Sequence, residues 1–181
     1  MKRERVKSYF LYGVFAFYLL LMAHILLFKN VSPMHLFNSG RIYHRSINFI
    51  PFSEIYNYLS GSLNTSPTAA TYNVFGNIAI FIPIGIYLAL FKKDKRVSVN
   101  ILLVFLISLS VEIIQFVFGL GVSDIDDIFL NCLGGLIGIL IYRGLVLLLK
   151  SEEKMRSIVS VFSTLVGLPI LVLVILLIVN N

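Results

Sequence analysis

Seven polar side chains stand in or directly beside long apolar segments of this chain, and their types could do chemistry. They are Asn77, Glu112, Gln115, Asp124, Asp126, Asp127 and Asn131. Ionisable and amide groups are costly at membrane depth, so each one is a candidate functional residue. Glu112, Asp126 and Asp127 are the catalytic candidates, because a carboxyl group can act as a general acid or base.

Three of these carboxylates lie within four residues of one another and repel if all are ionised. Asp124, Asp126 and Asp127 therefore need protons, a cation or a basic partner, for which Arg41 and Arg45 are the candidates. No cofactor is expected apart from a divalent cation, which these hard oxygen ligands could hold. The alternative is structural. Ser123 or Asp124 would then cap the start of a helix, and the other two aspartates would favour its positive end.

The other polar and small residues also have two interpretations. Asn77, Gln115 and Asn131 could orient a bound head group, and for Asn77 and Asn131 the alternative is a hydrogen bond from one helix to the next. Gly134 and Gly138, four residues apart, predict a close contact between helices. The sequence lacks the motifs of phosphate-binding loops, zinc proteases and serine hydrolases, so no residues for soluble nucleotide chemistry or serine hydrolysis are visible.

The elements that must position these residues are membrane spans. Of the 181 residues, 58% are hydrophobic and 13% are charged, against roughly 45–50% and 25% in soluble domains. About 20 apolar residues cross a bilayer as a helix, and five segments have that length: 9–28, 74–91, 101–120, 128–149 and 158–179. Arg143 lies inside the fourth, which favours a membrane part that starts nearer Ile125 and ends near Tyr142. We expect an all-α bundle of about five transmembrane helices.

Basic residues predict the orientation of this bundle, because cytoplasmic loops carry the excess of Lys and Arg. Twelve of the 15 lie on one side of the predicted membrane, leaving Lys29, Arg41 and Arg45 on the other. The N-terminus is then cytoplasmic and the C-terminus outside, and the net charge of +6 needs no nucleic acid. The predicted parts are a basic N-terminus (1–8), the first span (9–28), an outer loop (29–73), a core of three spans (74–149), a cytoplasmic loop (150–157) and the last span (158–181).

This orientation places the polar groups in one layer. With a rise of about 1.5 Å per residue, Asn77 lies roughly 5 Å below the outer edge, Glu112 about 12 Å and Asn131 about 5–10 Å. The three aspartates lie at the edge itself. Spans that merely packed together would not need this convergence, so we expect an outward-facing polar cluster in the outer half of the bilayer.

The long outer loop contains one amphipathic pattern. Its apolar positions recur at helical spacing: Phe52, Ile55, Tyr56, Leu59 and Leu63. The pattern predicts either an interfacial helix lying on the outer leaflet or a lid packed on the bundle.

Four segments together resemble the VanZ family. They are Ser46–Phe52, Asn77–Gly85, Ser110–Gln115 and Asp124–Gly135, and the resemblance covers roughly Arg41–Tyr142. It implies a multi-pass protein of the bacterial cell membrane, in the envelope of a Gram-positive bacterium. It also implies low-level resistance to teicoplanin-type glycopeptides. The family has no established catalytic residues to carry over.

Three functions fit these observations. In the first, the polar cluster binds or alters a lipid-linked or cell-wall component, with Asn77, Glu112, Gln115, Asp124, Asp126, Asp127, Asn131, Arg41 and Arg45 as binding residues. Its partners would be the bilayer and either the glycopeptide or a lipid-linked cell-wall precursor. In the second, the cluster belongs to an intramembrane enzyme acting on a lipid or polyprenyl head group. In the third, the protein is a structural membrane partner without chemistry, so whether it is an enzyme stays open.

Overall fold

The computed structural model describes residues 2–29, 31–34, 45–52, 56, 60, 67–92 and 94–179. The chain divides into two compact units, which are described separately. One consists of Ala23–Arg143, and the other of Met1–Met22 with Gly144–Asn181. All the described candidate residues lie in the unit Ala23–Arg143.

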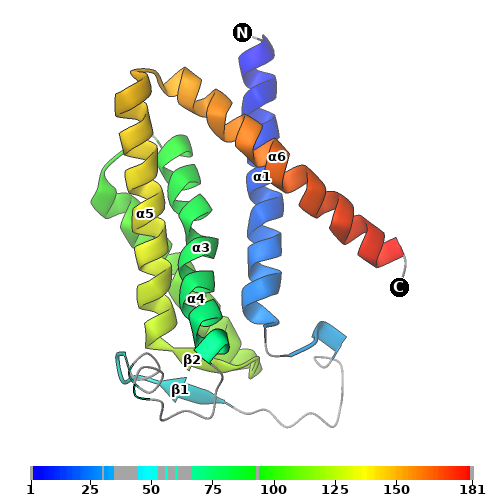
Figure 1. The fold of residues 1–181 in the computed structure, drawn as a ribbon, viewed down its shortest axis with the longest axis vertical. Coiled ribbons are helices and arrows are strands. Elements are labelled where there is room, and N and C mark those ends of the chain that lie inside the picture. Colours follow the sequence, from blue (N-terminus) through cyan, green and yellow to red (C-terminus); the bar gives the residue numbers. More distant parts are fainter. Residues whose placement is uncertain are drawn as a thin grey trace. The chain divides into compact units, whose positions relative to one another are not determined.

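Five helices carry the apolar segments. Their bounds are α1 Lys2–Leu27, α3 Pro67–Phe91, α4 Val97–Phe118, α5 Ile125–Leu149 and α6 Glu152–Val179. Within the described residues, each is long and apolar enough to cross a membrane, which confirms the expected five helices. α5 begins at Ile125 and runs past Arg143, so the basic residue lies within a continuous helix. Figure 1 shows α3, α4 and α5 side by side.

Two short strands, which the sequence did not predict, accompany the five helices. β1 (Ser46–Asn48) pairs in parallel with β2 (Val122–Asp124), and Asn48 is in register with Asp124. The pair lies where α4 ends and α5 begins (Figure 1). The pairing holds the residues of β1, which precede α3 in the chain, beside the start of α5. Of the predicted amphipathic helix in this segment, Ile55, Leu59 and Leu63 lie outside the described residues.

A glycine sets the sharp turn that leads into β2. Gly119 ends α4 in the left-handed conformation, with φ of 56°, and its N–H group bonds to the last carbonyls of the helix. The N–H of Leu120 also donates to the carbonyl oxygen of Gln115, at 2.8 Å. This helix cap satisfies backbone groups that would otherwise be buried without partners.

The turn between α3 and α4 carries the basic residues expected there. Lys95 Nζ donates to the carbonyl oxygens of Ala89 (2.7 Å) and Leu90 (3.2 Å), at the negative end of α3. Arg96 bonds to Asp94 through both its guanidinium and its backbone N–H. These hydrogen bonds lower the pKa of the Asp94 carboxyl to about 2.

Glycines allow α3 and α5 to pack backbone against backbone. A Cβ atom on Gly134 would collide with the carbonyl of Ile78, and one on Gly138 with the carbonyl of Ile82. On α3, a Cβ atom on Gly85 would collide with the carbonyl of Gly135. The two glycines four residues apart therefore make the close helix contact that their spacing predicts.

We predict that Gly138→Ala destabilises the protein, because its methyl group has to push α3 and α5 apart. Overpacking of this kind costs about 1–3 kcal/mol, which lowers the melting temperature by several degrees in a chain of this size. Thermal unfolding in detergent measures the change. Gly144→Ala is the matched control on the same helix, since no described atom lies within 4 Å of its added Cβ. Equal melting temperatures for the two variants would contradict the close contact.

Candidate functional site

Asp127 is held by side chains from two other parts of the fold. It lies in the first turn of α5, where the helix dipole favours a negative charge. Lys29 Nζ, just beyond α1, lies 2.8 Å from Asp127 Oδ2. Asn77 Nδ2, on α3, donates to Asp127 Oδ1. Asn73 lies 3.5 Å from both charged groups. The predicted need of this carboxylate for a basic partner is thus met by Lys29.

Asp124 caps α5, as its structural interpretation predicted. Its Oδ1 accepts the N–H of Asp126 at 2.8 Å, the second residue of the helix. Its Oδ2 accepts Asn48 Nδ2 at 2.9 Å, across the register of β1 and β2. The carboxylate of Asp124 therefore caps α5 and also bonds to Asn48 of β1.

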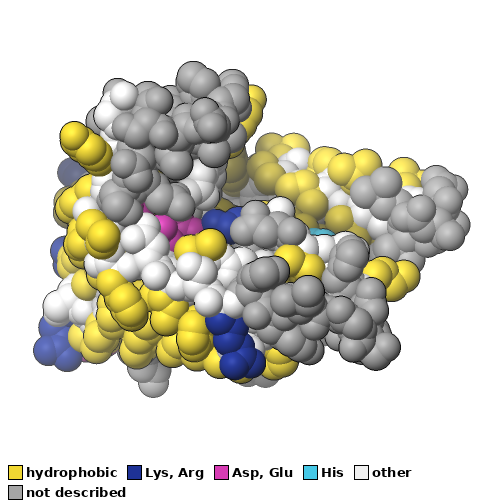
Figure 2. All heavy atoms as spheres, turned by 90° about the horizontal axis from the view of Figure 1, so that it is seen from below, with side chains coloured by type: hydrophobic (Ala, Val, Ile, Leu, Met, Phe, Trp, Pro, Cys, Tyr) yellow, Lys and Arg dark blue, Asp and Glu magenta, His cyan; other side chains and the backbone are white. Residues whose placement is uncertain are grey.

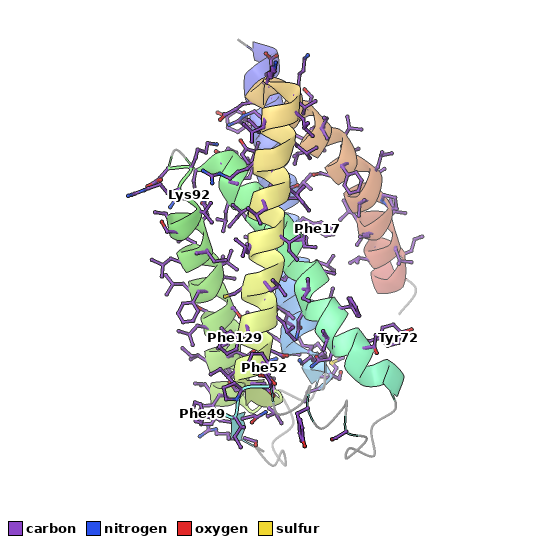
Figure 3. The ribbon with its side chains drawn as sticks, turned by 60° about the vertical axis from the view of Figure 1, so that its left-hand side comes forward. Phe17, Phe49, Phe52, Tyr72, Lys92 and Phe129 are labelled. Carbon is purple, nitrogen blue, oxygen red and sulfur yellow. The ribbon has the colours of Figure 1, made fainter. Side chains whose placement is uncertain are left out.

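Asp126 holds the segment before α3 in an unusual backbone conformation. The N–H of Phe52 donates to Asp126 Oδ1 at 2.5 Å. Phe52 has a φ of 62°, which is rare for a bulky residue and persists where surrounding contacts enforce it. Its ring also stacks on Phe129 of α5, with 5.8 Å between centroids. Figure 3 shows these two rings beside each other near the start of α5.

Glu112 joins α4 to this arrangement. Its Oε2 accepts the N–H of Asp124 at 2.9 Å, and the side chain is 3% exposed. Glu112, Asp124, Asp126 and Asp127 form what we call the carboxylate cluster, and none of the four is more than 4% exposed. Figure 2, viewed from the end with β1 and β2, shows only a small patch of Asp and Glu atoms, beside Lys or Arg atoms.

The other two predicted amides, Asn131 and Gln115, donate to neighbouring helices rather than to these carboxylates. Asn131, one turn after Asp127, donates to Ser108 Oγ at 2.9 Å. Gln115 donates to the carbonyl oxygen of Leu26 in α1, at 3.0 Å. Both are hydrogen bonds between helices, and in the described part of the chain the amide oxygens of both residues are buried without a partner. The contact of Asn131 matches its structural interpretation, and the contact of Gln115 with Leu26 was not predicted.

The predicted basic partners have different positions. Arg45 donates to the carbonyl oxygen of Val117 at the end of α4, at 3.1 Å, and Arg41 lies outside the described residues. Sequence reasoning missed Lys29 and Asn48 as members of the site. The signals were available: Lys29 directly follows the first apolar segment, and Asn48 belongs to the segment Ser46–Phe52 that resembles the VanZ family.

The three aspartates do not form a metal site in the residues that the structure describes. No three His, Cys, Asp or Glu side chains in that part of the chain could hold a metal ion together. The oxygens of Asp124 and Asp127 accept hydrogen bonds from amide, backbone and ammonium groups instead. A divalent cation stays a prediction from the sequence.

We predict that Lys29 and Asp127 are energetically coupled. Lys29→Met leaves a buried carboxylate without its ammonium partner, which costs about 1–3 kcal/mol. Combining it with Asp127→Asn removes both charges, so the double variant loses less stability than the two single losses added together. A double-mutant cycle on unfolding in detergent should give a coupling energy of about 0.5–3 kcal/mol. Lys154→Met, at an exposed lysine of α6, is the control for loss of a positive charge. Strict additivity would contradict the coupling.

Comparison with known proteins gives two matches. The sequence model of the VanZ/LLP1 family matches residues 15–149, which include every described candidate residue. Protein VanZ of Enterococcus faecium is 35% identical over 122 residues, which are 66% of this chain and 73% of that protein. No solved structure matches the chain.

Proposed function

This chain belongs to the VanZ/LLP1 family, and on that premise we propose that it lowers the sensitivity of a bacterium to teicoplanin-type glycopeptides. Its five apolar helices and its family make it a multi-pass membrane protein. The proposed location is the cell membrane of a Gram-positive bacterium, with β1, β2 and the carboxylate cluster on the outer side. Glycopeptides act outside the cell membrane, so this orientation would put the cluster where it can affect their action.

We further propose that the carboxylate cluster binds or alters a lipid-linked or cell-wall component. The observation that carries this proposal is the burial of Glu112 within a helix of membrane length, 3% exposed and beside a second buried carboxylate, Asp124. Burying a carboxylate is expensive, and two neighbours raise the cost because like charges repel. A glutamine would accept the same N–H from Asp124 without a charge, so packing alone gives no reason for a glutamate at this position.

The positions of the cluster also support a binding role. Its members come from the end of α4, from β2 and from the first turn of α5. The side chain of Lys29 is 28% exposed while it contacts Asp127, so a cationic group remains accessible beside the carboxylates. A polar head group at the membrane surface could therefore meet both signs of charge within a small area.

We predict that Glu112→Gln and Asp126→Asn each return teicoplanin sensitivity to that of cells without the protein. Both substitutions remove a charge and keep an acceptor oxygen, so a loss of protection reports the charge rather than the packing. The measurement is the inhibitory concentration of teicoplanin, and of vancomycin alongside, in a glycopeptide-sensitive host at equal membrane abundance.

The control for this experiment is Asp94→Asn. It removes a carboxylate from the turn between α3 and α4, outside the cluster, and should leave protection unchanged. Full protection by both cluster variants would overturn the binding role and favour a structural one. Unchanged sensitivity with the unmodified protein in several hosts would overturn the proposed resistance itself.

A further inference from the structure

A groove between α4 and α5 leads to the carboxylate cluster. Its volume is about 580 Å³, within the roughly 300–1,000 Å³ typical of small-molecule sites. Its walls are apolar and come from both helices: Phe105, Leu109, Ile113, Phe116, Ile128 and Phe129. Four polar residues also line it, Asn48, Glu112, Ser123 and Asp124, although nearly all of the surface that faces the groove is apolar. The groove therefore offers a lipid long apolar walls and a few polar contacts.

The length and the exposure of the groove match a lipid chain. From Phe105 to Phe116, its wall on α4 runs for about 16 Å at 1.5 Å per residue. One leaflet contributes about half of the ~30 Å hydrocarbon core, so the two lengths agree. Several wall residues are also exposed, among them Ile113 at 53% and Phe129 at 49%. On a helix of membrane length such side chains face lipid tails, and a chain could enter the groove from the bilayer.

The two carboxylates that line the groove, Glu112 and Asp124, favour a lipid head group that carries a positive charge. None of the described residues that line the groove is Lys, Arg or His. Glu112 accepts a backbone N–H, and Asp124 accepts an amide and a backbone N–H, so these hydrogen-bond donors are all neutral. Lys29 contacts Asp127 and its charge also acts on Glu112, but Lys29 itself does not line the groove. The complement of these two carboxylates is a cation that also donates hydrogen bonds.

We propose that the groove binds one membrane lipid whose head group carries a primary amine. The amine donates hydrogen bonds to Glu112 and Asp124, and one acyl chain lies between α4 and α5 along the apolar walls. This inference rests on the proposed function, because it names the ligand class of the same carboxylate cluster.

The experiment uses fluorescence quenching by lipids with brominated acyl chains. The sequence contains no tryptophan, so Phe105→Trp introduces a single tryptophan, in the groove wall. Leu106→Trp is the matched control, because the next residue of α4 lies at the same depth, is 47% exposed and does not line the groove. Each variant is reconstituted in bilayers with brominated phosphatidylethanolamine, phosphatidylcholine or phosphatidylglycerol of identical chains, and only tryptophan is excited.

At Phe105→Trp we expect phosphatidylethanolamine to quench with a relative binding constant about tenfold above the other two lipids. This is the effect of one charge-assisted hydrogen bond. At Leu106→Trp the three lipids should quench alike, as ordinary surrounding lipid does. Adding Glu112→Gln and Asp124→Asn to Phe105→Trp should abolish the preference. Equal quenching at Phe105→Trp by phosphatidylethanolamine and either other lipid would overturn the proposal.

The two proposals fail in different ways. A head-group preference that is present while Glu112→Gln still protects against teicoplanin would leave the lipid site standing and overturn the role of the carboxylate cluster in protection. Loss of protection in Glu112→Gln with equal quenching by the three lipids would keep the proposed function and overturn the amine lipid as its ligand.

Discussion

Buried carboxylates that meet at the start of α5 are the constraint on which the described site depends. Asp124 caps the helix, Asp126 holds the backbone of Phe52, and Asp127 pairs with Lys29. Glu112 accepts the N–H of Asp124 and so connects α4 to the same turn. Each charge is stabilised by donors from a different element. The cluster therefore links the end of α1, β1, α3 and α4 to a single helical turn.

The helix packing makes this meeting possible. Gly134 and Gly138 let the backbone of α5 lie directly against α3, which brings Asn77 within reach of Asp127. Gly119 ends α4 sharply enough for β2 to begin three residues later. The glycines of α5 and the left-handed cap of α4 thus set the distances between these elements, and these distances allow the polar side chains to form hydrogen bonds. The groove beside the cluster follows from the same arrangement, because α4 and α5 are joined at their polar ends and line it with apolar side chains.

The sequence was sufficient for the helices and for part of the site. Long apolar segments predict membrane helices because no other element satisfies the backbone in lipid, and the glycine spacing predicted the contact of α5. Two features lay beyond it. β1 and β2 have three residues each and are far apart in the chain, so no periodicity identifies their pairing. Gln115 shares a helical stripe with Glu112, yet its amide contacts Leu26 of α1, because spacing gives the face of a helix and not its neighbour.

The measurement that tests the central claim most directly separates the cap from the charge at Asp124. Asparagine caps helices as well as aspartate, so Asp124→Asn keeps the bond to the N–H of Asp126 and gives up the negative charge and the contact with Asn48. Teicoplanin sensitivity and melting temperature are measured on the same variant. A cluster that binds a cationic group predicts lost protection, with a melting temperature lowered only by the loss of the contact with Asn48. Full protection with that melting temperature would contradict the account, because the carboxylate would then serve only as a cap.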